Sequence, residues 1–530
     1  MTEHANPRPI ERHCDVLVVG GSAAGLAAAV QISRQARAVI VVDAGEPRNA
    51  PAAHMHGYLG RDGSPPAELL AAGRSEVRRY GGEVLDGRVE RVSHRDDGTF
   101  RAELVGGHAV VARRVLLATG LVDDLPEIEG VAAGWGRGVI HCPFCHGYEV
   151  RDRTVVQIVT HPMGLHPTAL FRQLTTDLTV VVHGAIDADG GLLDALREAG
   201  VAVRRTQVRR VVVRPDGGVD AVELADGTTL PADAVVVGPR FRARAEPFAG
   251  LGLQTTPHPS GLGDVVETDA AGATSVPGLH AAGNVTDPSH QVLHAAADGT
   301  RVGAMICFAL ADEDLRAGAR PSALSADWER RYEGDPMWSG NPNGSLVAEV
   351  AGLAPGRALD VGAGEGADAI FLAEAGWDVT ANDISGRALD RLRAEAGRRG
   401  LRVDCLRVDA NAAGAFDAQA YDLVSAQYAS IPRTGDDRGV HNLVGAVAAG
   451  GTLVVVSHDL EPMRVPIDTS TGSRAFDPDA YVRVEDVVAV LAPSPAWEIE
   501  VHERRPRPTG SATAAHHVDD VVLRARRSPA

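Results

Sequence analysis

A chain of 530 residues is too long for one hydrophobic core, so we expect three or four domains. The net charge of −18 argues against broad nucleic-acid binding. All 52 basic residues are arginine, which excludes Schiff-base chemistry and a phosphate-loop lysine. The polar N-terminus lacks the apolar stretch of a signal peptide, and no run of about 18 apolar residues is present to span a membrane.

The first predicted element is a short buried strand at residues 15–20, followed by a glycine-rich turn and a helix. Gly20 allows a tight turn, Gly25 allows the helix to pack closely, and the small Ser22 stands where a middle glycine is usual. The next strand ends at Asp43, 18 residues after Gly25, where a carboxylate can accept hydrogen bonds from a ribose. This order predicts a dinucleotide-binding site.

A pair of cysteines three positions apart, Cys142 and Cys145, is typical of a two-electron redox switch. A structural zinc site would need a second such pair, and the other cysteines are single, so no metal is expected. An inert pair remains the alternative. His146 lies beside Cys145 and is either an acid–base group for a thiol or a plain polar neighbour. A redox pair beside unpaired cysteines favours a reducing, cytoplasmic location.

The order of these motifs resembles that of the low-molecular-weight thioredoxin reductases. A second turn ends the strand at residues 114–120, and a third, at residues 278–287, precedes a helix from Gln291 to Leu310. The resemblance covers about residues 12–312 and implies two Rossmann-like domains, one inserted in the other. The domains are an FAD-binding domain in two parts, 1–125 and 246–315, and an inserted NADPH-type domain with the cysteine pair, 126–245.

The resemblance also implies roles for individual residues. Cys145 would face the flavin and Cys142 would attack the substrate disulfide. His146 stands where the family has aspartate and would take over proton transfer, and Asn284 also replaces a family aspartate. The residues implied to bind FAD are Gly20, Gly21, Ser22, Ala23, Ala24, Gly25, Asp43, Ala118, Thr119, Gly120, Gly283, Asn284, Gln291 and Val292.

The second nucleotide-binding turn of this family is degenerate here. After the strand at residues 154–159, only Gly164 survives from the glycine pattern, and Val159 and His161 place side chains where a pyrophosphate needs bare backbone. No arginine cluster follows His183 to hold a 2′-phosphate. We therefore expect the domain fold to persist, while NADPH is a doubtful ligand. Electrons could then pass from dithiol to flavin to oxygen, which resembles the small-molecule dithiol oxidases of this superfamily.

The C-terminal third repeats the alternation of strands and helices. Residues 311–326 are polar and predict a linker, placed at 316–326, and residues 327–530 form the last domain. A predicted strand at residues 357–361 is followed by a glycine turn. The next two predicted strands end at Asp383 and Asp409, and residues 497–522 predict a terminal hairpin. This alternation predicts a parallel sheet with a ligand at the carboxyl ends of its strands.

The turn at residues 360–366 resembles motif I of class I S-adenosylmethionine (SAM) methyltransferases, and the resemblance spans about residues 327–527. Its three glycines let the backbone approach the ligand, Asp383 can hold the ribose hydroxyls, and Asp409 can reach the adenine. Residues 328–343 are similar to the entry segment of methyltransferases that act on tellurite and thiopurines. A second NAD site is the alternative, and His458 is either a pocket or a surface residue. The expected SAM residues are Asp360, Gly362, Gly364, Gly366, Asp383 and Asp409.

The sequence thus predicts an α/β chain in which a thioredoxin-reductase-like flavoprotein is fused to a class I methyltransferase. The expected cofactors are FAD and SAM, and the expected substrates are small thiols, dithiols or disulfides. Three alternatives stay open: an NADPH-dependent reductase with an unrelated methyltransferase, a thioredoxin-like protein partner, and a flavin redox sensor that gates the methyltransferase. No nucleic acid or membrane is expected as a partner, and a homodimer is left open.

Overall fold

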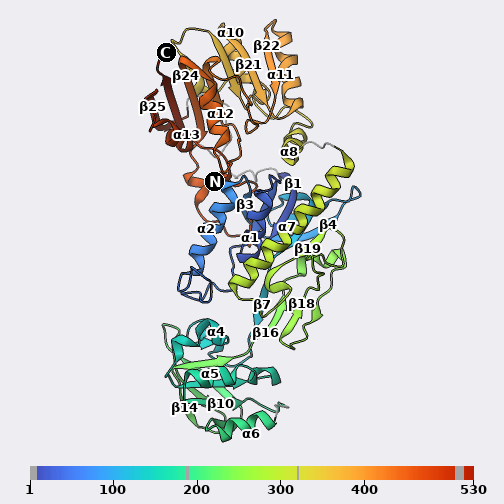
Figure 1. The fold of residues 1–530 in the computed structure, drawn as a ribbon, viewed down its shortest axis with the longest axis vertical. Coiled ribbons are helices and arrows are strands. Elements are labelled where there is room, and N and C mark those ends of the chain that lie inside the picture. The colour runs from blue at the N-terminus through green and yellow to red at the C-terminus, as the bar shows by residue number, and fades with distance from the viewer. Residues whose placement is uncertain (1–8, 187–189, 319–321, 508–518, 530) are drawn as a thin grey trace, which may run out of the picture.

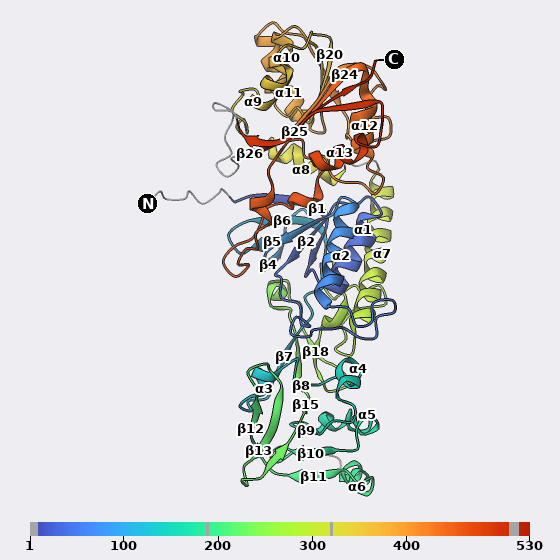
Figure 2. The same ribbon diagram turned by 90° about the vertical axis from the view of Figure 1, so that its left-hand side faces the viewer.

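The computed structural model describes residues 9–529, except for 187–189, 319–321 and 508–518. Figures 1 and 2 show three bodies stacked along the long axis. The N-terminal body lies in the middle, the body with the cysteine pair lies at one end, and the C-terminal body lies at the other. Each contains a parallel sheet with helices, so the predicted α/β fold class is confirmed.

The N-terminal body is built on a sheet of order β3-β2-β1-β6-β5-β4, with β19 also paired to β6. The apolar run in β1 is fully buried between its parallel neighbours β2 and β6. Its strands are β1 Glu11–Val19, β2 Val39–Asp43, β3 Glu83–Asp86, β4 Val89–His94, β5 Phe100–Leu104, β6 Ala109–Leu117 and β19 Leu279–Ala281. Its helices are α1 Ala23–Ser33, α2 Pro66–Arg79, η3 Glu246–Leu251, η4 Gly283–Val285 and α7 Val292–Ala317.

Helices α1 and α7 cross on one face of this sheet at backbone contact. A Cβ atom on Gly299 of α7 would lie 2.0 Å from the carbonyl oxygen of Ala24 in α1. This close approach holds the start of α1 and the start of α7 side by side. The turns that precede both helices therefore meet at the carboxyl edge of the sheet.

Two neighbouring strands link the N-terminal body to the body with the cysteine pair. Strands β7 and β16 are antiparallel and belong to a sheet of order β17-β18-β16-β7, and the inserted body has sheets of order β11-β10-β9-β15-β8 and β12-β13-β14. The linking strands are β7 Leu121–Asp124, β16 Arg240–Ala243, β17 Thr256–Pro257 and β18 Gly263–Val265. The inserted strands are β8 Val139–Ile140, β9 Val155–Val159, β10 Leu178–Val182, β11 Ala202–Arg205, β12 Val208–Val213, β13 Val219–Leu224, β14 Thr229–Pro231 and β15 Ala234–Val237. The inserted helices are α3 Val131–Gly134, α4 Pro143–His146, η1 Tyr148–Val150, η2 Pro162–Leu165, α5 Thr168–Leu174 and α6 Gly190–Glu198.

The C-terminal body has a sheet of order β22-β21-β20-β23-β24-β26-β25, parallel up to β24 and closed by the predicted antiparallel hairpin. The strands are β20 Arg357–Val361, β21 Asp378–Asp383, β22 Val403–Arg407, β23 Tyr421–Gln427, β24 Val447–His458, β25 Trp497–Pro506 and β26 Asp519–Arg527. The helices are α8 Ala323–Arg331, α9 Gly344–Val350, α10 Ala367–Glu374, α11 Gly386–Arg398, α12 Arg438–Ala446, η5 Glu461–Arg464, η6 Pro478–Ala480 and α13 Val484–Leu491.

One boundary differs from the sequence prediction. Helix α7 continues past Leu310 to Ala317, so residues 311–317 of the polar stretch that predicted a linker are helical. Alanine, arginine, glutamate and aspartate there support a solvent-facing helix, which stops at Gly318 with φ +79°. The predicted linker 316–326 contains the end of α7 and the start of α8, and its residues 319–321 lie outside the described ranges.

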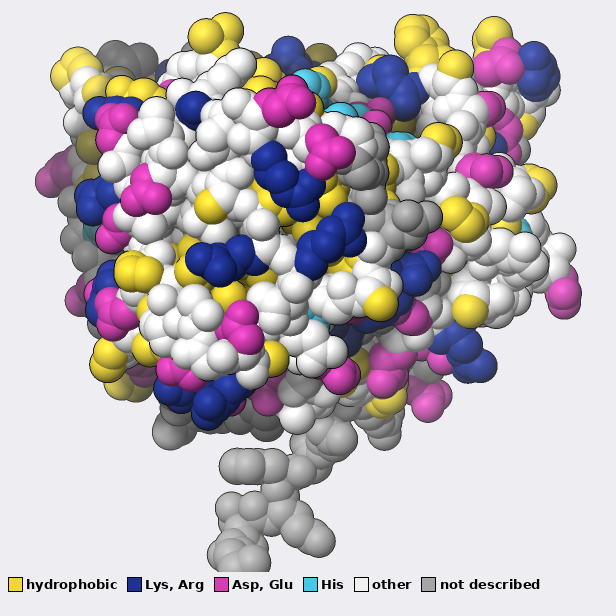
Figure 3. All heavy atoms as spheres, turned by 90° about the horizontal axis from the view of Figure 1, so that it is seen from below, with side chains coloured by type: hydrophobic (Ala, Val, Ile, Leu, Met, Phe, Trp, Pro, Cys, Tyr) yellow, Lys and Arg dark blue, Asp and Glu magenta, His cyan; other side chains and the backbone are white. Residues whose placement is uncertain are grey.

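Figure 3 looks along the long axis onto the end formed by the inserted body, where basic, acidic and apolar side chains are interspersed. Within the described ranges, no helix has the length and apolar character needed to cross a membrane.

Candidate functional site

A cavity of about 560 Å³ lies at the carboxyl ends of β1, β2 and β6, between the N-terminal body and the cysteine pair. Two predicted residues lie beneath it: a Cβ atom on Gly25 would meet the Gly20 carbonyl oxygen at 1.9 Å, and one on Gly283 would meet the Ala24 Cβ at 2.7 Å. The predicted residues that line the cavity are Gly20, Gly21, Ser22, Ala23, Ala24, Asp43, Ala118, Thr119, Gly120, Cys145, His146, Asn284, Gln291 and Val292.

The glycine turn and Asp43 form the cradle that a dinucleotide requires. Gly20 has φ +108°, and a Cβ atom there would lie 2.4 Å from the carbonyl oxygen of Ala118. A Cβ atom on Gly21 would lie 2.5 Å from the carboxyl carbon of Asp43, so any side chain would fill the space in front of that carboxylate. Asp43 is buried, accepts a hydrogen bond from the Gly45 N–H (3.1 Å) and is paired with Arg74. The residues present therefore fit a nucleotide with a ribose diol.

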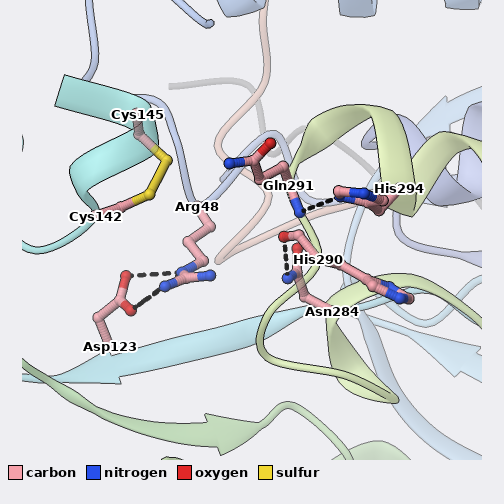
Figure 4. Close-up of a disulfide and its surroundings, with 8 residues drawn as sticks. All are labelled: Arg48, Asp123, Cys142, Cys145, Asn284, His290, Gln291 and His294. Atoms are coloured by element: carbon pink, nitrogen blue, oxygen red, sulfur yellow. Dashed lines mark hydrogen bonds and ion pairs between the residues drawn. A yellow bond between two sulfur atoms is a disulfide. The ribbon is translucent and has the colours of Figure 1, made fainter. Parts of the chain in front are cut away.

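Cys142 and Cys145 form a disulfide, with their Cα atoms 5.3 Å apart, at the start of the short helix α4. Cys145 lines the cavity and Cys142 does not. Figure 4 shows the disulfide facing the loop and helix start that hold Asn284 and Gln291. Between the two cysteines, Phe144 is 66% exposed, so the disulfide has an accessible apolar neighbour.

His146 lies beside Cys145 and is equipped to accept a proton. Its Nδ1 atom is buried and has no hydrogen-bond partner among the residues that the structure describes. Burial lowers the pKa of His146, the charge of Glu149 partly opposes this effect, and His56 adds to it. The imidazole is therefore neutral at pH 7, and its Nδ1 atom is free of hydrogen bonds to the described residues.

Asn284 shows why an amide can replace a carboxylate in the third turn. Its Nδ2 group donates hydrogen bonds to the backbone carbonyl oxygens of His290 (2.7 Å) and Asp287 (3.3 Å). An ionised aspartate could not make these bonds, because it has no donor. They hold the loop just before α7, where the N–H of Gln291 donates to Nδ1 of His294 (3.3 Å), as Figure 4 shows.

Several cavity residues could not be predicted from the sequence. Arg48 donates to Asp123 through Nε (3.0 and 3.1 Å) and Nη2 (2.7 Å), and its guanidinium lies over the ring of Phe241. No sequence pattern joins positions so far apart. His141 immediately precedes Cys142 and could have been singled out on that ground. It lines the cavity against Trp135, and burial, with a contribution from Arg48, lowers its pKa to about 4.

The degenerate second turn is closed by the protein's own groups. Nε2 of the buried Gln157 donates to the Gly164 carbonyl oxygen (2.6 Å), so a side chain of β9 holds this turn from within. The ring of His161 lies against Gly238, with Nε2 2.9 Å from the position of a Cβ atom there. Pro162 and Pro167 at the starts of η2 and α5 have no N–H to offer a phosphate.

In the C-terminal body, the carboxylate of Asp383 supports the glycine turn. It accepts hydrogen bonds from the N–H groups of Gly364 (2.9 Å) and Ser385 (2.8 Å). Gly364 has φ +55°, and Tyr332 and Trp338 lie over it, so the predicted entry segment covers this turn. The other turn glycines, Gly362 and Gly366, are also left-handed. Asp409 follows β22 and borders a second cavity of about 260 Å³.

Asp360 is the most unusual group of this turn. It is 2% exposed, and its Oδ2 atom has no hydrogen-bond partner within the described part of the chain. Burial raises its pKa well above the ordinary value, and the carboxylates of Asp368 and Asp383 add to the effect. A buried, unpartnered carboxyl oxygen here is suited to a cationic ligand group. The structure thus gathers Asp360, Asp383 and the three turn glycines at the end of β20 and β21.

His458 is neither free nor fully exposed. It ends β24, its ring stacks on that of Tyr428 at 4.3 Å, and its Nδ1 atom lies 2.5 Å from Arg507. Its position at the carboxyl edge of the sheet is the one the sequence indicated, but its ring is held by these two neighbours.

Known proteins match the two parts of the chain separately. The family model for pyridine nucleotide-disulphide oxidoreductases matches residues 14–299, and a methyltransferase-domain model matches residues 358–451. Thioredoxin reductase sirT of Leptosphaeria maculans is 30% identical over 324 residues, which are 58% of this chain and 98% of the relative. Thioredoxin reductase tcpT of Claviceps purpurea is 31% identical over 281 residues, or 51% of this chain and 86% of the relative.

Solved structures agree with these relatives. The crystal structure of HlmI is 38% identical, with a TM-score of 0.54, and the match covers 60% of this chain and 98% of that one. An oxidoreductase from Agrobacterium tumefaciens is 34% identical, with a TM-score of 0.53, over 57% of this chain and 99% of that one. These matches cover only part of the chain, because the methyltransferase region lies beyond them.

Proposed function

The chain belongs to the pyridine nucleotide-disulphide oxidoreductase family and joins a thioredoxin-reductase-like domain to a methyltransferase domain, and from this premise we propose that it is a bifunctional enzyme of small thiols. The first half would be an FAD-dependent thiol–disulfide oxidoreductase and the second a SAM-dependent methyltransferase. The main support is the cavity that Cys145 and His146 share with the glycine turn and Asp43.

The redox step uses both cysteines. A substrate thiolate attacks Sγ of Cys142, the bond to Cys145 breaks, and Cys145 leaves as a thiolate. The second thiolate of the same substrate then attacks the substrate sulfur that is bonded to Cys142. This closes the substrate disulfide and releases the Cys142 thiolate. The substrate loses two protons and two electrons, and His146 accepts one of the protons while solvent takes the other. FAD held in the cavity would supply the two-electron acceptor that returns the Cys142/Cys145 dithiol to the disulfide, and dioxygen would be the final acceptor of the two electrons and two protons, as hydrogen peroxide.

The direction of electron flow follows from the second turn. A pyrophosphate binds through bare backbone N–H groups, and here the turn carries the side chain of His161 and two prolines that lack an N–H. Dithiol oxidation needs only the cysteine pair, FAD and oxygen. We therefore propose that dithiols, rather than NADPH, reduce this enzyme, and that its product is the substrate disulfide.

The methyltransferase half would act on the same class of sulfur compound. Asp360 would face the ammonium group of SAM, and Asp383 would accept hydrogen bonds from its ribose, because both carboxylates lie at the glycine turn. A substrate thiolate would attack the methyl carbon, the carbon–sulfonium bond would break, and S-adenosylhomocysteine would leave. A free dithiol is thus a reactant for both halves, with ring closure or S-methylation as its two fates.

The experiment measures both reactions on the purified full chain. We expect about one FAD per chain after reconstitution, oxygen consumption with dithiothreitol, and transfer of the methyl group from SAM to the same dithiol. Cys142→Ser should abolish oxygen consumption and leave methyl transfer unchanged, and Asp360→Asn should do the reverse. A chain that takes up no FAD, or that methylates only compounds without sulfur, would contradict the proposal.

A further inference from the structure

A segment of the C-terminal body reaches onto the N-terminal body. We call residues 465–480, between η5 and α13, the crossover segment. In Figures 1 and 2 this orange-red stretch leaves the C-terminal body and lies along the strands of the middle body. It has no counterpart in the predictions from the sequence.

The contact with the edge of the N-terminal sheet is buried and held by several hydrogen bonds. Asp477 is 1% exposed, and its carboxylate accepts from the N–H of Val84 in edge strand β3 (2.8 Å) and from Nε of Arg78 (2.7 Å). Arg12 donates to the Ala475 carbonyl oxygen (2.8 Å) and pairs with Glu83 (2.5 Å). The segment therefore lies against the open edge of this sheet and covers part of it, mainly through side-chain hydrogen bonds.

The same segment continues behind the wall of the 560 Å³ cavity. The N–H of Arg474 donates to the Asp86 carbonyl oxygen (2.8 Å), and Nε of Arg474 donates to the Asp86 carboxylate (3.1 Å). Oγ of Ser473 accepts from the N–H of Arg88 (3.3 Å), and Oγ1 of Thr469 donates to the Ala44 carbonyl oxygen (2.9 Å). Arg88 and Ala44 both line the cavity.

A chain of alternating charges joins the crossover segment to the ribose carboxylate. Asp43 pairs with Arg74, Arg74 also lies 3.4 Å from the carboxylate of Asp86, and Asp86 pairs with Arg474 at 3.1 Å. Each charged side chain in this series of ion pairs orients the next one. Without Arg474, Asp86 would lose its outer partner, and Arg74 would be less firmly placed against Asp43.

We propose that Arg474, supplied by the methyltransferase half, is a positioning residue for the adenosine ribose of FAD, and that bound FAD in turn orders the crossover segment. This inference rests on the proposed function, because it takes FAD as the ligand of the cavity. In this arrangement, a residue of the methyltransferase half completes the FAD site of the N-terminal body. By thermodynamic linkage, any gain in FAD affinity from an ordered segment equals the gain in segment order from bound FAD.

The first test compares FAD affinities of full-length apoproteins by titration with FAD. Arg474→Met and Asp86→Asn should each weaken FAD binding by about tenfold, the scale of one lost charge-assisted hydrogen bond. The double variant should bind as weakly as Asp86→Asn alone, because Arg474 acts through Asp86. Arg399→Met, which removes a surface ion pair with Glu374 (2.9 Å) elsewhere in the C-terminal body, should bind like the wild type.

The second test follows hydrogen exchange in the full chain with and without FAD. We expect FAD to slow exchange in residues 466–477 of the wild type but not of Arg474→Met, with the rest of both proteins equally protected. Unchanged or tighter FAD binding by Arg474→Met, additive losses in the double variant, or exchange in 466–477 that ignores FAD would overturn the inference. If the wild type itself binds no FAD, the proposed function fails first and the inference fails with it.

Discussion

At the scale of single residues, the two cysteines differ in what they face. Cys145 lines the cavity with the glycine turn, and Cys142 does not. We predict that Cys142→Ser, reduced with a dithiol, shows a thiolate–flavin charge-transfer band, because Cys145 remains next to the nucleotide site. Cys145→Ser should lack the band in a visible absorption spectrum. The opposite pattern would exchange the two roles.

His146 determines the acid side of the pH profile. Burial lowers its pKa below the ordinary value of 6.5, so the imidazole stays neutral and able to accept a proton as the pH falls through 6.5. We predict that His146→Gln is slower by roughly 10²-fold, the scale of lost general acid–base catalysis, and that this ratio of wild-type to variant rates shrinks only below pH 6.5, where His146 becomes protonated. Stopped-flow rates across pH check both statements. An unchanged rate in His146→Gln would make this residue a plain neighbour of Cys145.

Asp360 links SAM binding to protons. Its pKa is raised in the free protein by burial and by two neighbouring carboxylates, and a bound ammonium group would favour the ionised form. Binding should therefore release a proton, and the affinity for SAM should rise as the pH rises. Calorimetry in buffers of different ionisation enthalpy measures this release. In Asp360→Asn the release should disappear, and a wild type that binds SAM equally well from pH 6 to pH 8 would contradict the role of this carboxyl group.

The sequence was enough to identify residues that belong to short local motifs. It was not enough to identify pairs of residues that lie far apart along the chain. Gly20, Asp43 and Cys145 lie in local patterns, which physical chemistry ties to a turn, a ribose or a disulfide. Arg48 with Asp123 and Asp86 with Arg474 are partners only because the fold brings distant segments together. No local periodicity encodes such a meeting, so these groups required the structure.

At the scale of elements, buried parallel strands were the easiest to predict. The runs at residues 16–19 in β1 and 39–42 in β2 are continuously apolar because both faces of their sheet are covered. The end of α7 was missed, because a solvent-facing helix and a linker share a polar composition. The crossover segment was also missed, since its contacts are hydrogen bonds and ion pairs with another domain, which leave no periodic signal.

The crossing of α1 and α7 yields a stability prediction. Gly299→Ala would place Cβ 2.0 Å from the Ala24 carbonyl oxygen, so we expect a loss of about 1–3 kcal/mol, typical of overpacking. Gly397→Ala in α11 meets no atom within 4 Å and should instead raise stability by about 0.5–1 kcal/mol, the helix preference of alanine over glycine. Urea unfolding of both variants gives the comparison. Equal effects would show that the helices do not meet at backbone contact.

At the scale of the whole molecule, the N-terminal body separates the disulfide from the methyltransferase body (Figures 1 and 2). A small dithiol would therefore leave one site and reach the other through solvent. Under the proposed function, the fusion would then matter less for direct transfer than for equal amounts of both activities. The crossover segment adds a physical connection, since it joins the wall of the 560 Å³ cavity to the C-terminal body.

The central claim is that a dithiol, and not NADPH, supplies electrons to this enzyme. The closed second turn removes backbone donors and inserts bulk, and two losses of about 1–3 kcal/mol each would raise a micromolar dissociation constant for NADPH to roughly millimolar. Anaerobic stopped-flow mixing of the FAD-loaded full chain with either reductant at sub-millimolar concentration tests this directly. We predict that a suitable dithiol bleaches the flavin within about a second, as ordinary turnover rates imply, while NADPH leaves it oxidised. Bleaching by NADPH within that time, with no response to the dithiol, would contradict the claim and identify an NADPH-dependent reductase.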